Sequence, residues 1–334
     1  MIVRATCSGL LLLFVRFFRI GSVHSRHYSV SARYREYPGI VLNSVTVQAP
    51  AKINMALRVG SPRPDGFHPL ATVFCALDLR DELTASAADE FSLEIHGVPL
   101  DVDEDNLVYR AARLLKERTG SDACAAISID KSIPVAGGLA GGSANAAATL
   151  VAFNELWELG LSASELHDLG AELGSDVPFS LLGGLALGTS RGDELVPIRP
   201  GAFQSWVLVM DGEGLSTPAV FREYDRLHPD PHKPAPVDEL VEALGSSAIS
   251  DLEGLLVNDL AEPAFAMRPD IADTFRRIEH AGVATVLSGS GPTIGVLCAS
   301  DNEADVLAGQ LRNDGLKTVR ADGPAAGAHI VRSS

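Results

Sequence analysis

A short glycine-rich segment, IPVAGGLAGGSANAAATL (residues 133–150), restricts the fold of this chain more than any other. It follows an alternating apolar stretch and runs into alanines, which favour helix. A strand that turns through glycines into a helix presents free backbone N–H groups at the positive end of the helix dipole, which is a natural anion site. The same residues could instead form a flexible joint, or a place where a helix packs closely on a sheet.

The spacing of this segment excludes the two commonest phosphate-binding loops. A Walker A loop needs a lysine before its final serine or threonine, whereas Ser143 directly follows Gly142. The dinucleotide pattern G-x-G-x-x-G is also absent, because no two of these glycines are separated by one residue.

Alternating hydrophobicity predicts β-strands on both sides of a turn-rich loop. In residues 45–59 apolar side chains alternate with Lys52, Asn54 and Arg58, so we expect a strand with a polar face. The prolines and the Asp-Gly pair of residues 61–70 predict a loop. Residues 125–130 alternate again and lead directly into the glycines.

Capping signals predict where the helices of the first half begin and end. The expected starts are Asp105 as an N-cap, Ser143 as an N-cap, and Ser162 in a capping box with Glu165. The expected stops are Gly120 and Gly174.

The second half follows a change in composition and mixes the same two kinds of element. We expect a strand over 205–211, a helix capped by Ser250 with Glu253, a helix that ends at Gly282, and a helix closed by Gly315. Strands and helices do not alternate strictly, so the fold class expected is α+β rather than a doubly wound sheet. The expected division is an extension over 1–44, a first domain over 45–195 and a second α+β domain over 196–334.

Charge restricts the partners of this chain. The formal net charge is −16, and without the arginine-rich first 44 residues it is −21. Such a body repels nucleic acid and anionic membranes, and an anionic ligand would need a local basic or amide-lined pocket. The scattered cysteines include no C-x-x-C pair, which is typical of reduced thiols in a cytoplasmic protein. No obligate protein partner is evident.

The first 44 residues have two interpretations. Their arginines and serines and their shortage of acids are typical of an organellar transit peptide, whereas translated upstream sequence would give the same absence of pattern. We favour the second, and expect that deletion of residues 1–40 leaves folding intact.

Several candidate functional residues have ordinary structural roles by default. Lys52 on its strand would be solvated, Asp176 would cap the turn before Val177-Pro178, and His68 would lie on the surface. The SGSGPT stretch, residues 288–293, could be no more than a tight turn.

The order of these segments resembles that of the GHMP kinases. PAKINMAL, IPVAGGLAGGSANAAA and VLSGSGPTIGV are similar to the three motifs of that superfamily, which holds a nucleotide triphosphate without a Walker lysine. The sequences RPDGFHPLATVF and LGSDVPFSLLGGLAL narrow the resemblance to its 4-diphosphocytidyl-2-C-methyl-D-erythritol kinase family. The resemblance covers roughly residues 45–300, and it implies a two-domain fold with an N-terminal nucleotide-binding domain. It also implies ATP-dependent phosphorylation of the 2-hydroxyl of the cytidyl diphosphate substrate, in the non-mevalonate route to isoprenoids.

The resemblance implies a role for each matching residue. Asp176 and Lys52 match the catalytic pair, an arrangement suited to orienting a hydroxyl and steadying its developing charge. Residues matching the substrate site are Asn54, Phe67, His68, Asp176, Thr217 and Phe221. Residues matching the ATP site are Asn106, Lys131, Pro134, Gly137, Gly138, Leu139, Ala140, Gly141, Gly142 and Ser143.

The chain departs from the wider superfamily at the metal. ATP and Mg²⁺ are the expected cofactors, but Gly141 and Gly142 stand where other members carry serines that can meet Mg²⁺, so no metal ligand is predicted. Two alternatives remain. A homoserine or mevalonate kinase would have no use for Phe67-His68, and a catalytically dead nucleotide sensor should have lost Lys52 or Asp176.

Overall fold

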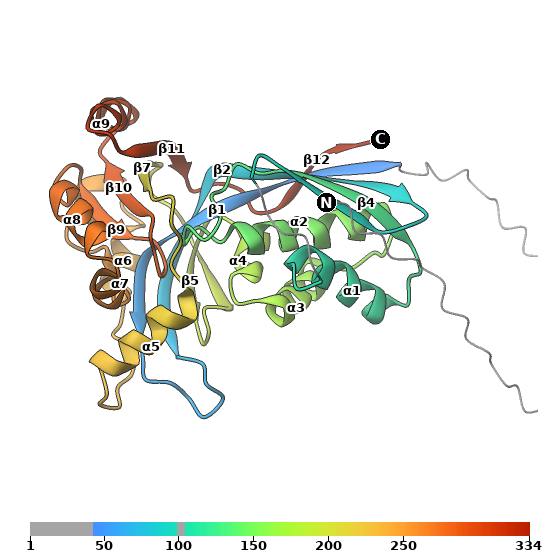
Figure 1. Ribbon diagram of the computed structural model, residues 1–334, viewed down its shortest axis with the longest axis horizontal. Coiled ribbons are helices and arrows are strands. Elements are labelled where there is room, and N and C mark those ends of the chain that lie inside the picture. The colour runs from blue at the N-terminus through green and yellow to red at the C-terminus, as the bar shows by residue number, and fades with distance from the viewer. Residues whose placement is uncertain (1–42, 99–103) are drawn as a thin grey trace, which may run out of the picture.

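The computed structural model describes residues 43–98 and 104–334, and it contains two β-sheets with helices packed against them (Figure 1). The first sheet has the order β12 (His329–Ser333), β1 (Ser44–Val59), β2 (Leu70–Ala88), β4 (Cys124–Asp130) and β3 (Ser92–His96). Joined to this path are β5 (Leu185–Thr189) and β6 (Glu194–Ile198), and the short β8 (Val257–Asn258). The second sheet has the order β11 (Lys317–Gly323), β7 (Gln204–Met210), β10 (Ile294–Cys298) and β9 (Ala284–Leu287).

The helices divide in the same way. Beside the first sheet lie α1 (Leu107–Thr119), α2 (Gly141–Leu156), α3 (Ala163–Leu173) and α4 (Val177–Leu182) (Figure 1). The later helices are α5 (Thr217–Leu227), α6 (Asp238–Ala243), α7 (Ala261–Met267), α8 (Pro269–Ile278) and α9 (Asp301–Asn313), with a 3₁₀ turn at Ile249–Leu252. The α+β class expected from the sequence is confirmed.

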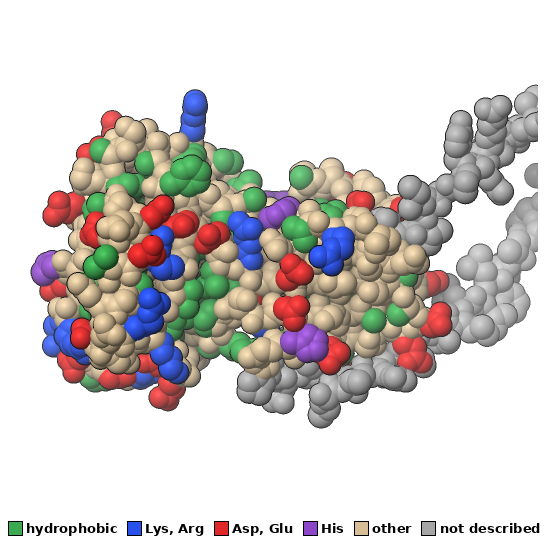
Figure 2. Space-filling model, turned by 90° about the horizontal axis from the view of Figure 1, so that it is seen from above, with side chains coloured by type: hydrophobic (Ala, Val, Ile, Leu, Met, Phe, Trp, Pro, Cys, Tyr) green, Lys and Arg blue, Asp and Glu red, His purple; other side chains and the backbone are tan. Residues whose placement is uncertain are grey.

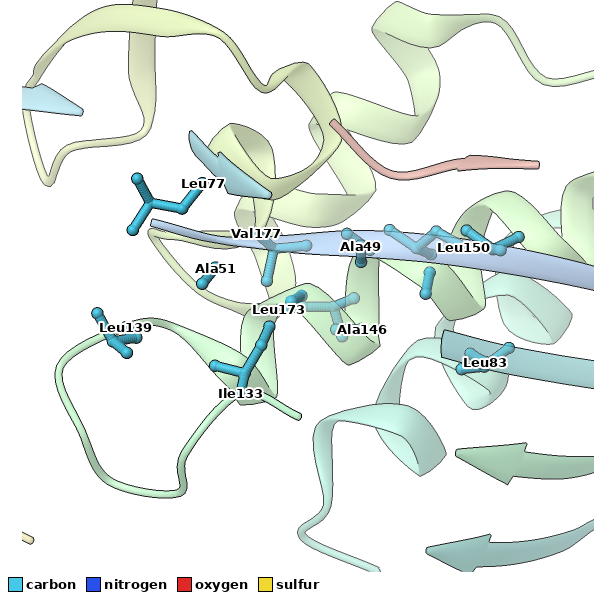
Figure 3. Packing of buried hydrophobic residues seen from close by; sticks show 14 of the residues in the cluster. Ala49, Ala51, Leu77, Leu83, Ile133, Leu139, Ala146, Leu150, Leu173 and Val177 are labelled. Atoms are coloured by element: carbon cyan, nitrogen blue, oxygen red, sulfur yellow. The ribbon is translucent and has the colours of Figure 1, made fainter. Parts of the chain in front are cut away.

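In the part of the chain that the structure describes, three hydrophobic clusters support these layers, and two of them are extensive. The larger contains β1, β2, α1, α2 and α3 and also reaches Trp206 and Leu208 of the second sheet. Figure 3 shows part of it, with Ile133 and Leu139 of the glycine-rich segment next to the strand and helix residues that they join. The smaller cluster lies between the second sheet and helices α5, α7, α8 and α9, and includes Leu57 and Val59 at the end of β1.

Strand β1 differs from its expected form. It pairs with β2 along its whole length and with β12 and β8 at its two ends. Its expected polar face is not solvated at Lys52 and Asn54, which are only 5% and 2% exposed. Almost every residue of β1 is buried, on both faces of the strand, so its polar side chains must find partners inside the protein.

The capping signals of the first half are partly confirmed. Ser162 and Glu165 form the expected capping box, and Gly120 and Gly174 follow the helices that they were expected to end. The N-cap of α1 is Asn106 and not Asp105, because the Asn106 side chain accepts the backbone N–H of Val108 at 3.0 Å.

The start of α2 is the more consequential correction. The helix begins at Gly141, two residues before the expected cap at Ser143, and its N-cap is Ala140 with φ 58° and no side-chain cap. A side-chain cap would occupy N–H groups at the helix start. Among the described residues no side-chain oxygen occupies them, so they can bind an anion.

Boundaries in the second half also differ. Ser250 lies within the 3₁₀ turn and does not cap a helix, α8 ends at Ile278 rather than Gly282, and α9 ends at Asn313 just before Gly315. The expected division between 195 and 196 falls inside β6, and β12 returns to the first sheet, so the two-domain division stays a prediction. The proposed extension lies outside the described residues except for positions 43 and 44, and Ser44 already belongs to β1.

Candidate active site

A cavity of about 830 Å³ lies where β1, the glycine-rich segment, the loop before β2 and helix α5 meet. It brings together most of the residues predicted for the site, namely Lys52, Asn54, Phe67, His68, Asn106, Pro134, Gly137, Gly138, Ala140, Gly141, Gly142, Asp176, Thr217 and Phe221. Lys131, Leu139 and Ser143 do not line it.

Lys52 stands at the centre of this cavity with two polar partners. Its Nζ donates to Asn54 Oδ1 at 2.6 Å and lies 3.8 Å from Asp176 Oδ2. Asn54 is held in turn, because its Nδ2 donates to the hydroxyl of buried Thr72 at 2.8 Å. The ammonium is therefore fixed next to a carboxylate whose side chain is 33% exposed to the cavity.

The surroundings of Lys52 make its charge costly. Burial lowers the pKa of the Lys52 ammonium, and the nearby negative charge of Asp176 opposes that shift. Groups whose pKa is moved by burial together with a specific charge partner in a cleft are typical of catalytic sites.

Asp176 lies between α3 and α4 and does not have its default structural role. It occupies the N-cap position of α4, but its side chain makes no capping hydrogen bond. The carboxylate lines the cavity instead, facing Lys52. The geometry thus favours a chemical rather than a capping function.

The SGSGPT turn holds the glycine-rich segment in place. Ser288 Oγ donates to the carbonyl of Gly138 at 3.0 Å, and the backbone N–H of Thr293 donates to that of Gly137 at 3.3 Å. A Cβ on Gly138 would lie 2.2 Å from the Ser288 carbonyl oxygen, and φ there is +76°. Only glycine permits this close approach, so the turn between β9 and β10 is part of the site.

Lys131, which the resemblance matches to the ATP site, does not line the cavity. Its Nζ forms an ion pair with Asp81 and donates to Asn145 Oδ1 at 3.0 Å, and both charged side chains are almost wholly buried. Asp81 also accepts the backbone N–H groups of Ser132 and Ile133, each at 2.8 Å. This buried group anchors the start of the glycine-rich segment to β2 and α2. Asp81 carries no signal in the sequence, since it is one aspartate within a long strand.

Leu139 and Ser143 are the other two predicted residues outside the cavity. Leu139 is fully buried in the larger cluster, and its carbonyl accepts the backbone N–H of Lys52 at 3.2 Å. Ser143 lies in the first turn of α2. Both could serve the site through their backbones.

The opposite wall of the cavity is aromatic. The rings of His68 and Phe221 lie 4.7 Å apart, and His68 Nε2 donates to Asp225 Oδ1 at 2.8 Å. Thr217 shares a 2.8 Å hydrogen bond with Ser290. The loop before β2 and helix α5 therefore form one wall, in line with the sequence-based pairing of Phe67, His68 and Phe221.

Arg191 and Arg222 also line the cavity and were missed from the sequence. Neither belongs to a motif, and only the fold brings the β5–β6 turn and helix α5 to the same place. The acidic body gives one general signal for Arg222, because an anionic ligand of such a protein needs a basic side chain nearby.

No cluster of three or more His, Cys, Asp or Glu side chains suited to a metal occurs in residues 43–98 and 104–334. The Asp176 carboxylate, which lines the cavity, suits Mg²⁺ carried by a nucleotide, because Mg²⁺ usually keeps several waters and binds through one or two carboxylates and substrate phosphates. Within the same ranges, no helix is both long and apolar enough to cross a bilayer. Acidic and basic side chains are interspersed on the described part of the face in Figure 2.

A known protein family matches a segment in each half of the chain. The family described as GHMP kinases N terminal domain matches residues 106–184, and that described as GHMP kinases C terminal matches residues 237–317. The 4-diphosphocytidyl-2-C-methyl-D-erythritol kinase of Mycolicibacterium smegmatis is 47% identical over 87% of this chain and 94% of its own length. The protein of that name from a Nocardioides species is 46% identical over 85% of this chain and 99% of its own.

Solved structures of members of the same superfamily are also similar to this chain. A crystal structure of 4-(cytidine 5'-diphospho)-2C-methyl-D-erythritol kinase has a TM-score of 0.70 at 31% identity, covering 84% of this chain and 100% of the other. The homoserine kinase of Cytophaga hutchinsonii has a TM-score of 0.66 at 19% identity, over 86% of this chain and 98% of its own, which shows a shared fold alone.

Proposed function

The chain belongs to the GHMP kinases, within the 4-diphosphocytidyl-2-C-methyl-D-erythritol kinase family, and from that premise we propose that it transfers the γ-phosphate of ATP to the 2-hydroxyl of 4-diphosphocytidyl-2-C-methyl-D-erythritol. This step belongs to the non-mevalonate route to isoprenoid precursors. The observation that carries the proposal is one cavity that joins an amide-lined glycine loop, a Lys–Asp pair and an aromatic wall.

Each part of that cavity has a role in the proposed reaction. The open start of α2 and the glycine loop bind the triphosphate through backbone N–H groups. Asp176 orients the acceptor hydroxyl and accepts its proton, and Lys52 steadies the developing alkoxide. Phosphoryl transfer depends mainly on positioning and charge neutralisation, so these few groups suffice.

The other residues that line the cavity recognise the two substrates. His68, Phe67 and Phe221 provide aromatic surface for the cytosine, with Thr217 beside them, and Asn54 faces the sugar alcohol. Asn106 and Pro134 border the nucleotide end, while Lys131 supports the loop from within the core. We further propose that Mg²⁺ bound with the nucleotide would neutralise the phosphates, and that the Asp176 carboxylate, which lines the cavity, would help to hold it.

An ATP-consumption assay that compares three acceptors tests the proposal. The cytidyl diphosphate substrate should support turnover, and mevalonate and homoserine should not. Removal of Mg²⁺ by EDTA should stop the reaction and added Mg²⁺ should restore it. Turnover with homoserine or mevalonate alone would assign the chain to another branch of the superfamily.

Substitution of Asp176 tests the chemical step. Asp176→Ala should lower kcat by about 10²–10⁴-fold, the usual contribution of a general base, while ATP still binds. Single-turnover kinetics and calorimetric titration with ATP measure the two effects separately. Near-normal turnover would remove Asp176 from the mechanism.

We also propose that the protein acts in the cytoplasm, without nucleic acid, membrane or an obligate protein partner, which its acidic body supports. The organellar alternative depends on residues 1–44, almost all of which lie outside the described residues. Import of a fluorescent fusion carrying residues 1–44 into an organelle would favour that alternative.

A further inference from the structure

Arg191 lies against the most exposed aromatic side chain of the cavity. Its guanidinium carbon is 5.2 Å from the centre of the Phe67 ring, a distance at which a cation attracts an aromatic face. Both residues line the cavity, although they are more than a hundred positions apart in the chain. Phe67 itself is 51% exposed, so the loop alone does little to hold the ring in one orientation.

The arginine is fixed before any ligand binds. Its Nε donates to Asp193 Oδ2 at 2.9 Å, and its backbone N–H donates to Asp193 Oδ1 at 3.1 Å. Its Nη2 donates to the carbonyl of Ala171 at 3.2 Å, near the end of α3 and five residues before Asp176. A planar guanidinium held at this many points loses little further freedom when it packs on a ring.

The turn that carries Arg191 is itself docked against the aromatic loop. Leu70, three residues after Phe67, donates its backbone N–H to the carbonyl of Ser190 at 2.8 Å. Ser190 has φ 59° in the left-handed region. A non-glycine residue persists there only where its surroundings hold it, and such residues gather at ligand sites.

We propose that Arg191 is a positioning residue that holds Phe67 in place as a stacking wall for the nucleobase of the acceptor. With the guanidinium on one side of the ring, the other side is left for a flat base. Asp193 balances the charge of Arg191, so the arginine acts on the ring and not as a ligand of the substrate phosphates. This inference rests on the proposed function, because it needs an acceptor that carries a base.

Steady-state kinetics of Arg191→Ala test it. Exposed cation–π contacts contribute about 0.5–1 kcal/mol, so the KM for the cytidyl substrate should rise about 2- to 5-fold. Both kcat and the KM for ATP should stay near those of the wild type. Asp193→Asn should raise the same KM by less, because it keeps the guanidinium but loosens its anchor. Arg199→Ala, at an exposed position outside the cavity, is the matched control and should change nothing.

A double-mutant cycle decides how Arg191 acts. In a Phe67→Leu background, Arg191→Ala should add no further rise in KM. Additive effects, or an unchanged KM in the single variant, overturn the inference while leaving the proposed function in place. Calorimetric titration of the wild type with cytidine 5'-diphosphate distinguishes failure of this inference from failure of the proposed function. A wild-type protein that neither binds this compound nor phosphorylates the cytidyl substrate contradicts both. If Arg191→Ala fails to fold, Asp193→Asn carries the same test.

Discussion

At the scale of single residues, the site depends on an ammonium kept away from water. Lys52 is nearly fully buried, with Asn54 and Asp176 as its polar partners. Burial of a charge is unfavourable unless it is paired, and the pair here is long, at 3.8 Å. A buried ammonium of this kind lowers the stability of the folded protein, and active sites commonly give up stability for activity in this way.

The pKa of Lys52 should respond to its carboxylate neighbour. In the wild type it should lie below the ordinary value of 10.5, and in Asp176→Asn it should fall further, because burial then acts unopposed. Since the unfolded chain binds this proton up to a higher pH than the folded protein, Lys52 makes stability rise with pH between the two pKa values. Nuclear magnetic resonance of ¹³C-labelled lysines, assigned with Lys52→Arg, measures the titration. A wild-type value at or above 10.5 would contradict this account.

At the scale of elements, the glycine-rich segment is a loop whose shape is set by its neighbours. The turn between β9 and β10 holds it from one side, and the Asp81–Lys131–Asn145 group holds it from inside. Its glycines therefore have unequal roles. Gly138 is in tight backbone contact with φ +76°, whereas a Cβ on Gly142 would meet only Leu107 Cδ1, at an ordinary 3.6 Å.

Alanine substitutions should separate these roles by stability. Gly138→Ala should cost at least about 1–2 kcal/mol from the left-handed backbone alone, and the clash with Ser288 adds to it. Gly142→Ala should be neutral or stabilising by up to about 1 kcal/mol, because it lies within α2. Urea unfolding measures both. Equal midpoints for the two variants would show that the turn does not hold Gly138.

Local signals in the sequence predicted local features. The strand over β1, the Ser162–Glu165 capping box and the Gly120 stop follow from neighbouring residues, and all three are present, although the polar face expected of β1 is buried. The start of α2 was missed because a helix that leaves its first N–H groups open carries no cap to recognise. The order of the motifs indicated the family, and the comparisons confirm it.

The functional residues that the sequence did not predict were missed for a different reason. Arg191, Arg222 and Asp81 act through contacts with segments far along the chain, which no spacing pattern records. Lys131 matched a motif but lies in a buried ion pair, because a motif gives the type of a residue and not the direction of its side chain.

At the scale of the whole molecule, the last strand completes the first sheet. Strand β12 pairs with β1 from Val45 to Gln48, and Ser334 bonds with Asn43 and Ser44 (Figure 1). Over these residues it covers backbone groups of β1 that would otherwise form an exposed edge. The final residues of the second half therefore stabilise the first.

Removal of residues 328–334 should therefore destabilise the sheet that carries Lys52. We expect a lower Tm and concentration-dependent association, since the uncovered edge of β1 can pair with another chain. Val331→Thr, at an exposed position of the same strand, keeps the backbone ladder and should leave Tm close to that of the wild type. Differential scanning calorimetry and light scattering report the two effects. A truncated chain with an unchanged Tm would show that β12 contributes little.

One continuous strand has a consequence for the choice of acceptor. Strand β1 carries Lys52 in its middle and ends at Val59, where the loop that bears Phe67 begins and is tied back by the Gly60–Pro69 backbone bond. The Lys52–Asp176 pair and the aromatic wall are thus connected by one continuous strand, which sets the distance between them. We therefore expect acceptors too short to contact the aromatic wall and Asp176 together to be poor substrates.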